Sequence, residues 1–292
     1  MSEHLLIIGG DSEIAAATAT YLREHGRGVI ATSRRRESIS ADRPFLDLSE
    51  PVEDWPVPDG VAAVCICAAI ARLNDCARDP IGSAAINVTG TVALAKKLAA
   101  GGIPVLFLST DKVFDGEHAH VPANAPPRPV SEYGRQKAAA EAALGEMMRI
   151  GAPTAILRLA KVVMPGMELL RQWIVELRGG RPIRAFRDMM MAPTPVALVA
   201  AAIERLLAAP TSGIFQLTGP RDVDYGEVAR HLARQIGADT KLVETVSAYS
   251  VGLPTGSTAR NTTLDSSALA ERFGIVVPDP WSVIDELIET CR

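Results

Sequence analysis

The sequence predicts a doubly wound α/β protein, in which a parallel sheet carries helices on both faces, with a smaller α/β lobe at its C-terminal end. Three observations support this fold class. Uninterrupted apolar runs, such as residues 4–8 and 61–69, are typical of parallel strands buried on both faces. These runs alternate with helical stretches through the first half of the chain. A glycine turn joins the first run to the first helical stretch, as in a Rossmann fold.

The first domain is expected to span residues 1–160. Its strands are predicted at 4–8, 28–33, 61–69, 103–110 and 153–160, and its helices at 15–22, 80–100 and 131–150. Residues 121–129 are rich in proline, which predicts an extended surface loop that joins the strand at 103–110 to the helix at 131–150 and could cover the site.

The second domain is expected to span residues 161–292, with some of its segments returning to the first domain. Helices are predicted at 168–177, 195–208, 224–236, 265–273 and 281–290, and strands at 181–186 and 213–219. Asp224 with Glu227 three residues later forms a capping-box pattern, which marks the start of one of these helices.

The turn after the first strand has an incomplete phosphate-binding pattern. Gly9 occupies the first place of G-x-x-G-x-x-G, whereas Ser12 and Ala15 stand in the second and third. A Cβ at the second place crowds a phosphate, so this loop alone is equally compatible with ordinary turn chemistry. The residues of this loop that are predicted to bind a dinucleotide are Gly9, Gly10, Ser12, Glu13 and Ile14.

The end of the second strand predicts which dinucleotide would bind. Ser33, Arg34 and Arg35 stand there without an acidic residue, a pattern that favours a 2′-phosphate and hence NADP(H), with NAD(H) as the alternative. A solvated basic turn would look the same. Further cofactor contacts are expected from Asp47 and Leu48, which follow the short run 43–46, and from Cys67, Ala68 and Ala69, which end the apolar run 61–69.

Tyr133 and Lys137 lie four residues apart and would share one helix face. A nearby ammonium favours the phenolate and lowers the pKa of a phenol. Such a pair can serve as a general acid for carbonyl reduction beside a bound hydride donor. A Y-x-x-x-K pattern also arises by chance at the start of an amphipathic helix.

Residues 109–116, with the sequence S-T-D-K-V-F-D-G, resemble the S-T-D-Y-V-F-D-G signature of dTDP-4-dehydrorhamnose reductases, in the extended short-chain dehydrogenase/reductase superfamily. Weaker matches occur in the same order as in that family. They are residues 86–91, 156–158 and 192–195, and Arg260 with 264–265. The resemblance therefore covers nearly the whole chain, and its most specific part is the signature followed by Y-x-x-x-K.

The resemblance implies roles for individual residues. Thr110 would hydrogen-bond the substrate carbonyl oxygen, and Tyr133 would protonate that oxygen. Lys137 would hold the nicotinamide ribose and lower the pKa of Tyr133, and Asn87 would lie near the nicotinamide. The residues expected to contact substrate are Thr110, Lys112, Val113, Phe114 and Arg260.

Three departures from the family pattern bear on the substrate. Lys112 replaces an aromatic residue of the signature, Cys67 replaces a common Asn, and three consecutive methionines at 189–191 replace a D-Q-x-G approach to Pro193. Each change alters the expected pocket lining, although adjacent methionines also serve as flexible packing.

Composition excludes several other classes of protein. With 292 residues and 48% hydrophobic content, the chain can bury a sizeable core. A net charge of −4 and the absence of a basic run with interleaved aromatic residues argue against nucleic-acid binding, and no apolar run is long enough to span a bilayer. The four cysteines lack disulfide or zinc spacing, and His118 and His120 lack a third metal ligand, so we expect no metal. The first strand begins almost at Met1, so we expect a cytoplasmic protein.

Taken together, the residues and the resemblance predict an NAD(P)H-dependent reductase acting on the keto group of a nucleotide-linked deoxysugar. A sugar-nucleotide epimerase of the same superfamily could use the same Tyr and Lys. A dehydratase is disfavoured, because Asp111 is followed by Lys112 and not by an acid. A catalytically idle Rossmann regulatory subunit, similar to that of methionine adenosyltransferase, is the third alternative. The helices at 80–100 and 131–150 are also compatible with a homodimer surface.

Overall fold

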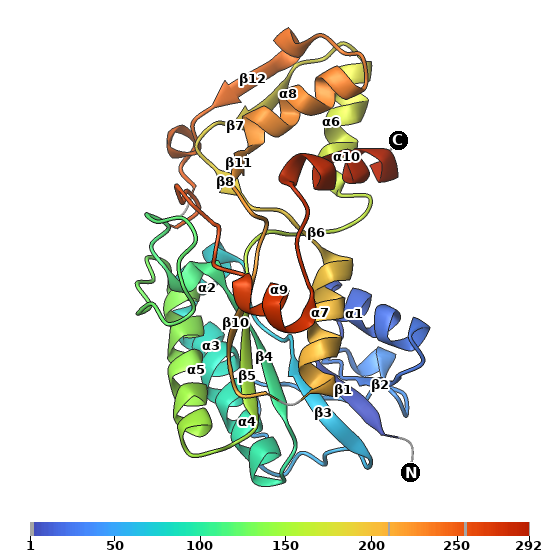
Figure 1. Ribbon diagram of the computed structural model, residues 1–292, viewed down its shortest axis with the longest axis vertical. Helices are drawn as coiled ribbons and strands as arrows, with labels where there is room; N and C mark the ends of the chain where they lie inside the picture. The colour runs from blue at the N-terminus through green and yellow to red at the C-terminus, as the bar shows by residue number, and fades with distance from the viewer. Residues whose placement is uncertain (1–2, 210, 254–255, 292) are drawn as a thin grey trace.

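A computed structural model describes residues 3–209, 211–253 and 256–291. Its centre is a six-stranded sheet in which every neighbouring pair of strands is parallel (Figure 1). The strand order is β10 (Gly213–Leu217), β5 (Thr154–Leu159), β4 (Val105–Thr110), β3 (Val61–Ile66), β1 (His4–Ile8) and β2 (Gly28–Ala31). The predicted Rossmann-like α/β fold is therefore confirmed.

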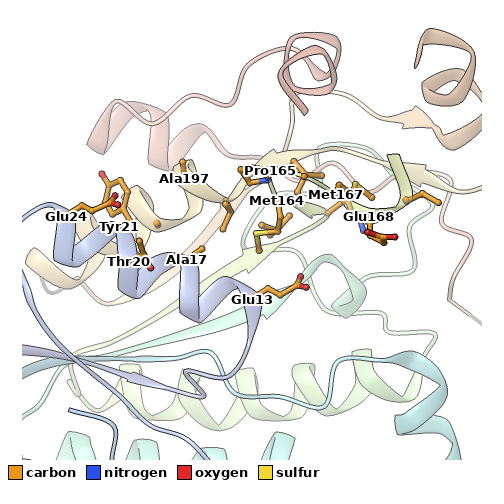
Figure 2. Close-up of a pocket in the computed structure, with 17 residues that line it drawn as sticks. Glu13, Ala17, Thr20, Tyr21, Glu24, Met164, Pro165, Met167, Glu168 and Ala197 are labelled. Atoms are coloured by element: carbon orange, nitrogen blue, oxygen red, sulfur yellow. The ribbon is translucent and has the colours of Figure 1, made fainter. Parts of the chain in front are cut away.

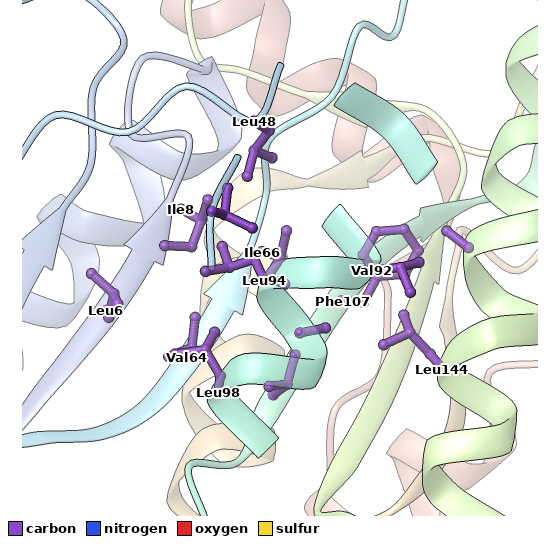
Figure 3. Close-up of a cluster of buried hydrophobic side chains, with 14 of the residues drawn as sticks. Leu6, Ile8, Leu48, Val64, Ile66, Val92, Leu94, Leu98, Phe107 and Leu144 are labelled. Atoms are coloured by element: carbon purple, nitrogen blue, oxygen red, sulfur yellow. The ribbon is translucent and has the colours of Figure 1, made fainter. Parts of the chain in front are cut away.

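Helices cover both faces of this sheet. One face carries α1 (Glu13–Glu24), α7 (Val196–Ala208) and α9 (Ser267–Phe273), and the other carries α4 (Thr91–Ala100) and α5 (Glu132–Arg149). Alternate strand residues point to opposite faces. Figure 3 shows the second of these layers, where Val64, Ile66 and Phe107 of the sheet pack against Leu94 and Leu144 of the helices.

The predicted single helix over residues 80–100 is wrong, because the structure interrupts it. It consists of α3 (Pro80–Ala84), a π-helical segment η2 (Ala85–Gly90) and then α4, preceded by the short α2 (Leu73–Arg78). The Ile86 carbonyl oxygen accepts the Thr91 backbone amide across the widened turn, and the Thr91 hydroxyl donates to the same oxygen at 2.8 Å. The interruption lies at the carboxyl edge of the sheet, where it turns the Asn87 side chain inward.

The C-terminal lobe has a core of its own. It contains α6 (Glu168–Arg178), α8 (Tyr225–Gln235) and α10 (Pro280–Cys291), together with β7 (Ile183–Phe186) paired in parallel with β12 (Val243–Val246). Two further small pairs join β8 (Met190–Met191) to β11 (Val223–Asp224), and β6 (Val162–Val163) to β9 (Thr194–Pro195). The predicted capping box at Asp224 is present, with Glu227 as its second member. Four short 3-10 helices occur along the described chain: η1 (Arg36–Ser38) and η3 (Asp111–Val113) in its first half, and η4 (Thr240–Leu242) and η5 (Ala248–Val251) in its second.

Segments that follow residue 160 contribute to the central sheet and its covering helices. Strand β10 forms one edge of the sheet beside β5, helix α7 packs on one face of the sheet, and α9 covers β10 (Figure 1). Residues 121–129 contain neither helix nor strand, in agreement with the expected extended loop, and Val121 forms a single bridge with Leu264.

Candidate active site

The start of α5 brings Tyr133 close to the end of β4. Ser131 caps the helix, and its hydroxyl accepts a hydrogen bond from the Gly134 amide at 3.1 Å. A Cβ on Gly134 would lie 2.1 Å from the Lys112 carbonyl oxygen, so only glycine permits this close approach of α5 to η3. Tyr133 thereby shares a hydrogen bond with the side chain of Thr110.

Thr110 ends β4 and begins η3. Its hydroxyl donates to the Asp111 carboxylate at 3.0 Å and accepts from the Lys112 amide at 3.2 Å. The Lys112 ammonium pairs with the same carboxylate at 3.1 Å. The chain therefore places a hydroxyl, a carboxylate and an ammonium on three consecutive residues beside the Tyr133 phenol.

Lys137 is buried behind Tyr133 on α5. Its ammonium donates to the Leu108 carbonyl oxygen at 2.7 Å and lies 4.1 Å from the centre of the Phe107 ring. Burial lowers the pKa of Lys137 to about 8, although the nearby Glu141 carboxylate opposes this change. Lys137 is therefore a lysine that can change its charge near neutral pH.

The expectation that Lys137 lowers the Tyr133 pKa is wrong in this structure. The pKa of Tyr133 is raised, first because its surroundings are poor in water and second because the Asp111 carboxylate disfavours a phenolate. The hydrogen bond with Thr110 acts in the opposite direction but is outweighed. Tyr133 is consequently a neutral phenol at neutral pH, which is the form that can donate a proton.

A cavity of about 290 Å³ contains these groups and is walled by both lobes. Thr110, Lys112 and Tyr133, which the sequence predicted, all line it. So do the three methionines at 189–191, whose position in the pocket was expected from their departure from the family pattern. Further lining residues that sequence reasoning missed are Asp111, Lys161, Tyr225 and Thr262. The position of Lys161 just after β5, at the carboxyl edge of the sheet, was the signal that could have found it.

Three predicted substrate residues lie outside this cavity wall. Val113 and Phe114 are buried in a small apolar cluster with Leu264. The Arg260 side chain is 82% exposed and lies 3.9 Å from a Glu117 carboxylate oxygen. Contact between these three residues and a substrate stays a prediction.

A second cavity, of about 260 Å³, lies at the carboxyl ends of β1, β2 and β3. Gly9 adopts a φ of +85°, and a Cβ there would lie 2.7 Å from Ala68, so glycine is required where the first loop meets the loop after β3. Eight of the predicted cofactor residues line this cavity: Gly9, Ser12, Arg34, Arg35, Asp47, Leu48, Ala68 and Ala69. A cleft bounded by a glycine turn, by aliphatic side chains and by two arginines fits the adenosine and phosphate portion of a dinucleotide.

A third cavity, of about 450 Å³, borders on both of the others. It shares Arg34, Ala69 and Ile70 with the dinucleotide cavity and Ala71 with the Tyr133 cavity. Residues 68–72 therefore form a common wall along the sheet edge. An extended ligand lying along this wall would reach from the glycine loop to Tyr133.

The remaining predicted cofactor residues do not line the dinucleotide cavity. Glu13 instead faces a larger hollow of about 920 Å³ between α1, α7 and residues 161–169 (Figure 2). Ile14 and Cys67 pack on apolar clusters, with the Cys67 sulfur 3.5 Å from that of Cys65. Gly10 and Ser33 lie beneath the cavity floor, where they hydrogen-bond within the loops that form it. Their predicted contact with cofactor stays a prediction.

Asn87 is fully buried, and its side chain hydrogen-bonds the backbone of Ile70 in the common wall. Its amide nitrogen donates to the Ile70 carbonyl oxygen at 2.9 Å, and its amide oxygen accepts from the Ile70 amide at 2.8 Å. A further bond of 2.8 Å runs from Asn87 to the Gln136 side chain, between Tyr133 and Lys137 on α5. Asn87 thus ties the wall to the helix that carries the candidate acid.

The part of the chain that the structure describes has no helix long and apolar enough to cross a membrane. Within the same residues, no group of three or more His, Cys, Asp or Glu side chains is arranged to hold a metal ion.

The six-stranded parallel sheet, with a glycine turn after β1 and the Tyr133–Lys137 helix beside β4, defines a Rossmann-like α/β protein. A family model described as the RmlD substrate binding domain matches residues 3–292, and the chain belongs to that family. The resemblance seen in residues 109–116 is thereby confirmed.

Named relatives are reductases. The chain is 27% identical to a probable low-salt glycan biosynthesis reductase, Agl14, of Haloferax volcanii, over 94% of each chain. It is 27% identical to a dTDP-4-dehydrorhamnose reductase of Sinorhizobium fredii, over 83% of this chain and 86% of that protein. The crystal structure of dTDP-4-dehydrorhamnose reductase from Bacillus anthracis in complex with NADP superposes with a TM-score of 0.82, covering 99% of this chain and 98% of that one. At 18% identity, this last likeness shows the fold alone.

Proposed function

We propose that this protein is an NAD(P)H-dependent reductase of the keto group of a nucleotide-linked deoxysugar, similar in reaction to dTDP-4-dehydrorhamnose reductase. The observation that carries the proposal is the convergence of the Thr110 and Tyr133 hydroxyls in one cavity, with Lys137 behind them. The reductases among the relatives support the reaction class.

The proposed chemistry divides between cofactor and protein. A bound reduced nicotinamide supplies the hydride that converts the keto carbon to an alcohol carbon. Tyr133 donates its phenolic proton to the keto oxygen, and Thr110 hydrogen-bonds the same oxygen as charge develops on it. Lys161 adds positive charge to the cavity wall, where the Lys112 charge is offset by Asp111, and this charge attracts the diphosphate of a nucleotide sugar.

The proposal includes binding of the cofactor by the eight residues that line the dinucleotide cavity, with NADP(H) favoured over NAD(H). A reductase described together with NADP among the solved structures of this fold supports that preference. A cytoplasmic location is part of the proposal, supported by the four cysteines, which are all free thiols. The homodimer expected from the helices at 80–100 and 131–150 stays a prediction.

Reduction of a keto group requires a tyrosine that begins the step as a neutral phenol, and the raised pKa of Tyr133 is consistent with that role. A catalytically idle regulatory protein has no need of Thr110, Tyr133 and Lys137 beside one cavity.

The proposal is tested by incubating the purified protein with NADPH and a dTDP-4-keto-6-deoxysugar. We expect loss of the reduced-nicotinamide absorbance together with formation of the 4-hydroxy sugar. Turnover of a 4-hydroxy sugar nucleotide to its epimer without net cofactor consumption would instead identify an epimerase. Failure to bind either NADPH or NADH would contradict both enzymatic assignments.

The lowered pKa of Lys137 predicts an alkaline limit on activity. If the ammonium form holds the cofactor ribose, kcat/KM for NADPH should fall as the pH rises through about 8. The folded protein binds fewer protons at this lysine than the unfolded chain between pH 8 and 10.5, so this group contributes stability that rises with pH over that range. The loss of rate would therefore not be unfolding caused by Lys137.

A pH–rate profile of the wild type and of Lys137→Arg checks this assignment. Arginine stays charged throughout the range, so its residual activity should lose the alkaline limb near pH 8. An unchanged alkaline limb in Lys137→Arg would assign the limb to another group.

A further inference from the structure

Asp11 supplies the acid that the end of β2 lacks. It lies in the loop between β1 and α1, and its carboxylate accepts hydrogen bonds from the Ser33 hydroxyl at 2.9 and 3.0 Å and from the Arg34 amide at 3.3 Å. The Arg43 guanidinium pairs with the same carboxylate at 2.6 Å. Asp11 also lines the dinucleotide cavity, together with Arg34.

Two hydrogen bonds from backbone amides hold the first loop against the residue that follows β2. The Gly9 amide donates to the Thr32 hydroxyl at 3.0 Å, and the Gly10 amide donates to the Thr32 carbonyl oxygen at 2.8 Å. These bonds fix the next residue, Asp11, directly beside Ser33. The position of the carboxylate is thus set by the sheet and does not depend on a flexible side chain alone.

This position matters for the choice of dinucleotide. In Rossmann folds, an acid at the end of the second strand accepts a hydrogen bond from the ribose 2′-hydroxyl, whereas basic and hydroxyl groups accommodate a 2′-phosphate. Here the Ser33 hydroxyl and the Arg34 amide, two donors available to a phosphate, already serve the Asp11 carboxylate. A phosphate at this point would meet a negative charge and would compete for the same donors.

Asp11 is ionised at neutral pH. Its partial burial raises the pKa of the carboxyl, but the hydrogen bonds from Ser33, Arg43 and Arg34 outweigh that effect and leave the pKa below its ordinary value. The side chains of Arg34 and Arg35 still line the cavity and attract a phosphate. The Asp11 carboxylate and the two arginine side chains therefore have opposite effects on a phosphate bound in this cleft.

We propose that Asp11 is a cofactor-specificity residue, whose carboxylate weakens binding of 2′-phosphorylated dinucleotides and keeps NADH competitive with NADPH. The proposal rests on the proposed function only in requiring that the cleft bind a nicotinamide dinucleotide. It assigns to a loop residue the discriminating role that the sequence pattern assigned to Ser33, Arg34 and Arg35.

Asp11→Asn tests the proposal, because it removes the charge and keeps an oxygen that can accept from Ser33. Kd values for NADPH and NADH are measured by titration, using the fluorescence of the bound reduced cofactor, without any sugar substrate. We expect the ratio Kd(NADH)/Kd(NADPH) to rise by about tenfold, which corresponds to about 1.4 kcal/mol. Asp11→Ser, a smaller uncharged variant, should shift the ratio in the same direction.

Asp42→Asn is the matched control, since it removes the same charge next to Arg43 from a side chain that is 68% exposed and outside the cleft. Its ratio should equal that of the wild type. An unchanged ratio in both Asp11 variants, or an equal rise in Asp42→Asn, would overturn the specificity role while leaving the reductase proposal intact. Absence of binding of either dinucleotide to the wild type would overturn both.

Discussion

Tyr133→Phe is expected to lower kcat by about 10²- to 10⁴-fold, the usual contribution of a positioned general acid. The substitution removes only the phenolic oxygen, and Tyr133 contributes its hydroxyl to the cavity that also contains Thr110. Because the folded backbone of α5 is set by Ser131 and Gly134, the variant should fold normally. Single-turnover loss of NADPH absorbance with saturating sugar nucleotide measures the effect on the chemical step.

Two further measurements separate loss of the acid from general damage. The Kd of NADPH should stay within about twofold of the wild type, since a factor of two is only ~0.4 kcal/mol. Tyr21→Phe is the matched control, because it removes a phenol that lines the large hollow beside α1 and not the Tyr133 cavity (Figure 2). A Tyr133→Phe protein that reduces the substrate at the wild-type rate would exclude Tyr133 as the proton donor.

The main elements of the fold were predictable because each carries a local signal. The strands β1, β3 and β4 are uninterrupted apolar runs, and the start of α8 carries a capping box. The π-helical segment η2 could not be predicted from such signals. It depends on the Thr91–Ile86 hydrogen bond and on the tertiary contacts of Asn87 with the wall of the cavities.

The chemistry of the site was only partly predictable. Spacing along one helix correctly associated Tyr133 with Lys137, but the direction of the Tyr133 pKa shift depends on burial and on Asp111, which come from packing against η3. Asp11 was missed for a similar reason. Its neighbour Ser33 is 22 residues away in sequence, and only the parallel pairing of β1 with β2 brings them together.

The second large effect is expected on the free energy of unfolding, at a buried ion pair that also contacts the proline-rich loop. Arg158 on β5 is 1% exposed, and its guanidinium donates to the Glu141 carboxylate at 2.7, 3.0 and 3.2 Å. The same guanidinium donates to the Ala123 carbonyl oxygen at 3.0 Å and to the Gln216 side-chain oxygen at 3.2 Å. One arginine therefore connects α5, β5, β10 and the loop over residues 121–129.

Glu141→Ala is expected to lower the free energy of unfolding by about 3–5 kcal/mol, because it leaves the buried Arg158 charge without its counter-ion. Urea denaturation followed by circular dichroism measures this loss. Glu146→Ala is the control on the same helix, since Glu146 is 69% exposed and its pair with Arg149 should contribute no more than about 0.5 kcal/mol.

The double variant Glu141→Leu/Arg158→Met separates the cost of an unpaired charge from the value of the pair itself. Replacing both charged partners by apolar side chains removes the uncompensated charge, so the double variant should be more stable than Glu141→Ala. It still leaves the Ala123 carbonyl and the Gln216 amide without their donor, and each unsatisfied buried group costs about 1–3 kcal/mol, so full recovery is not expected. If Glu141→Ala were no less stable than Glu146→Ala, the pair would contribute nothing beyond an exposed one. The connection of α5 to the proline-rich loop would then have to depend on the other contacts of that loop, such as the hydrogen bond of 2.8 Å from the Gln216 side chain to the Val121 carbonyl oxygen.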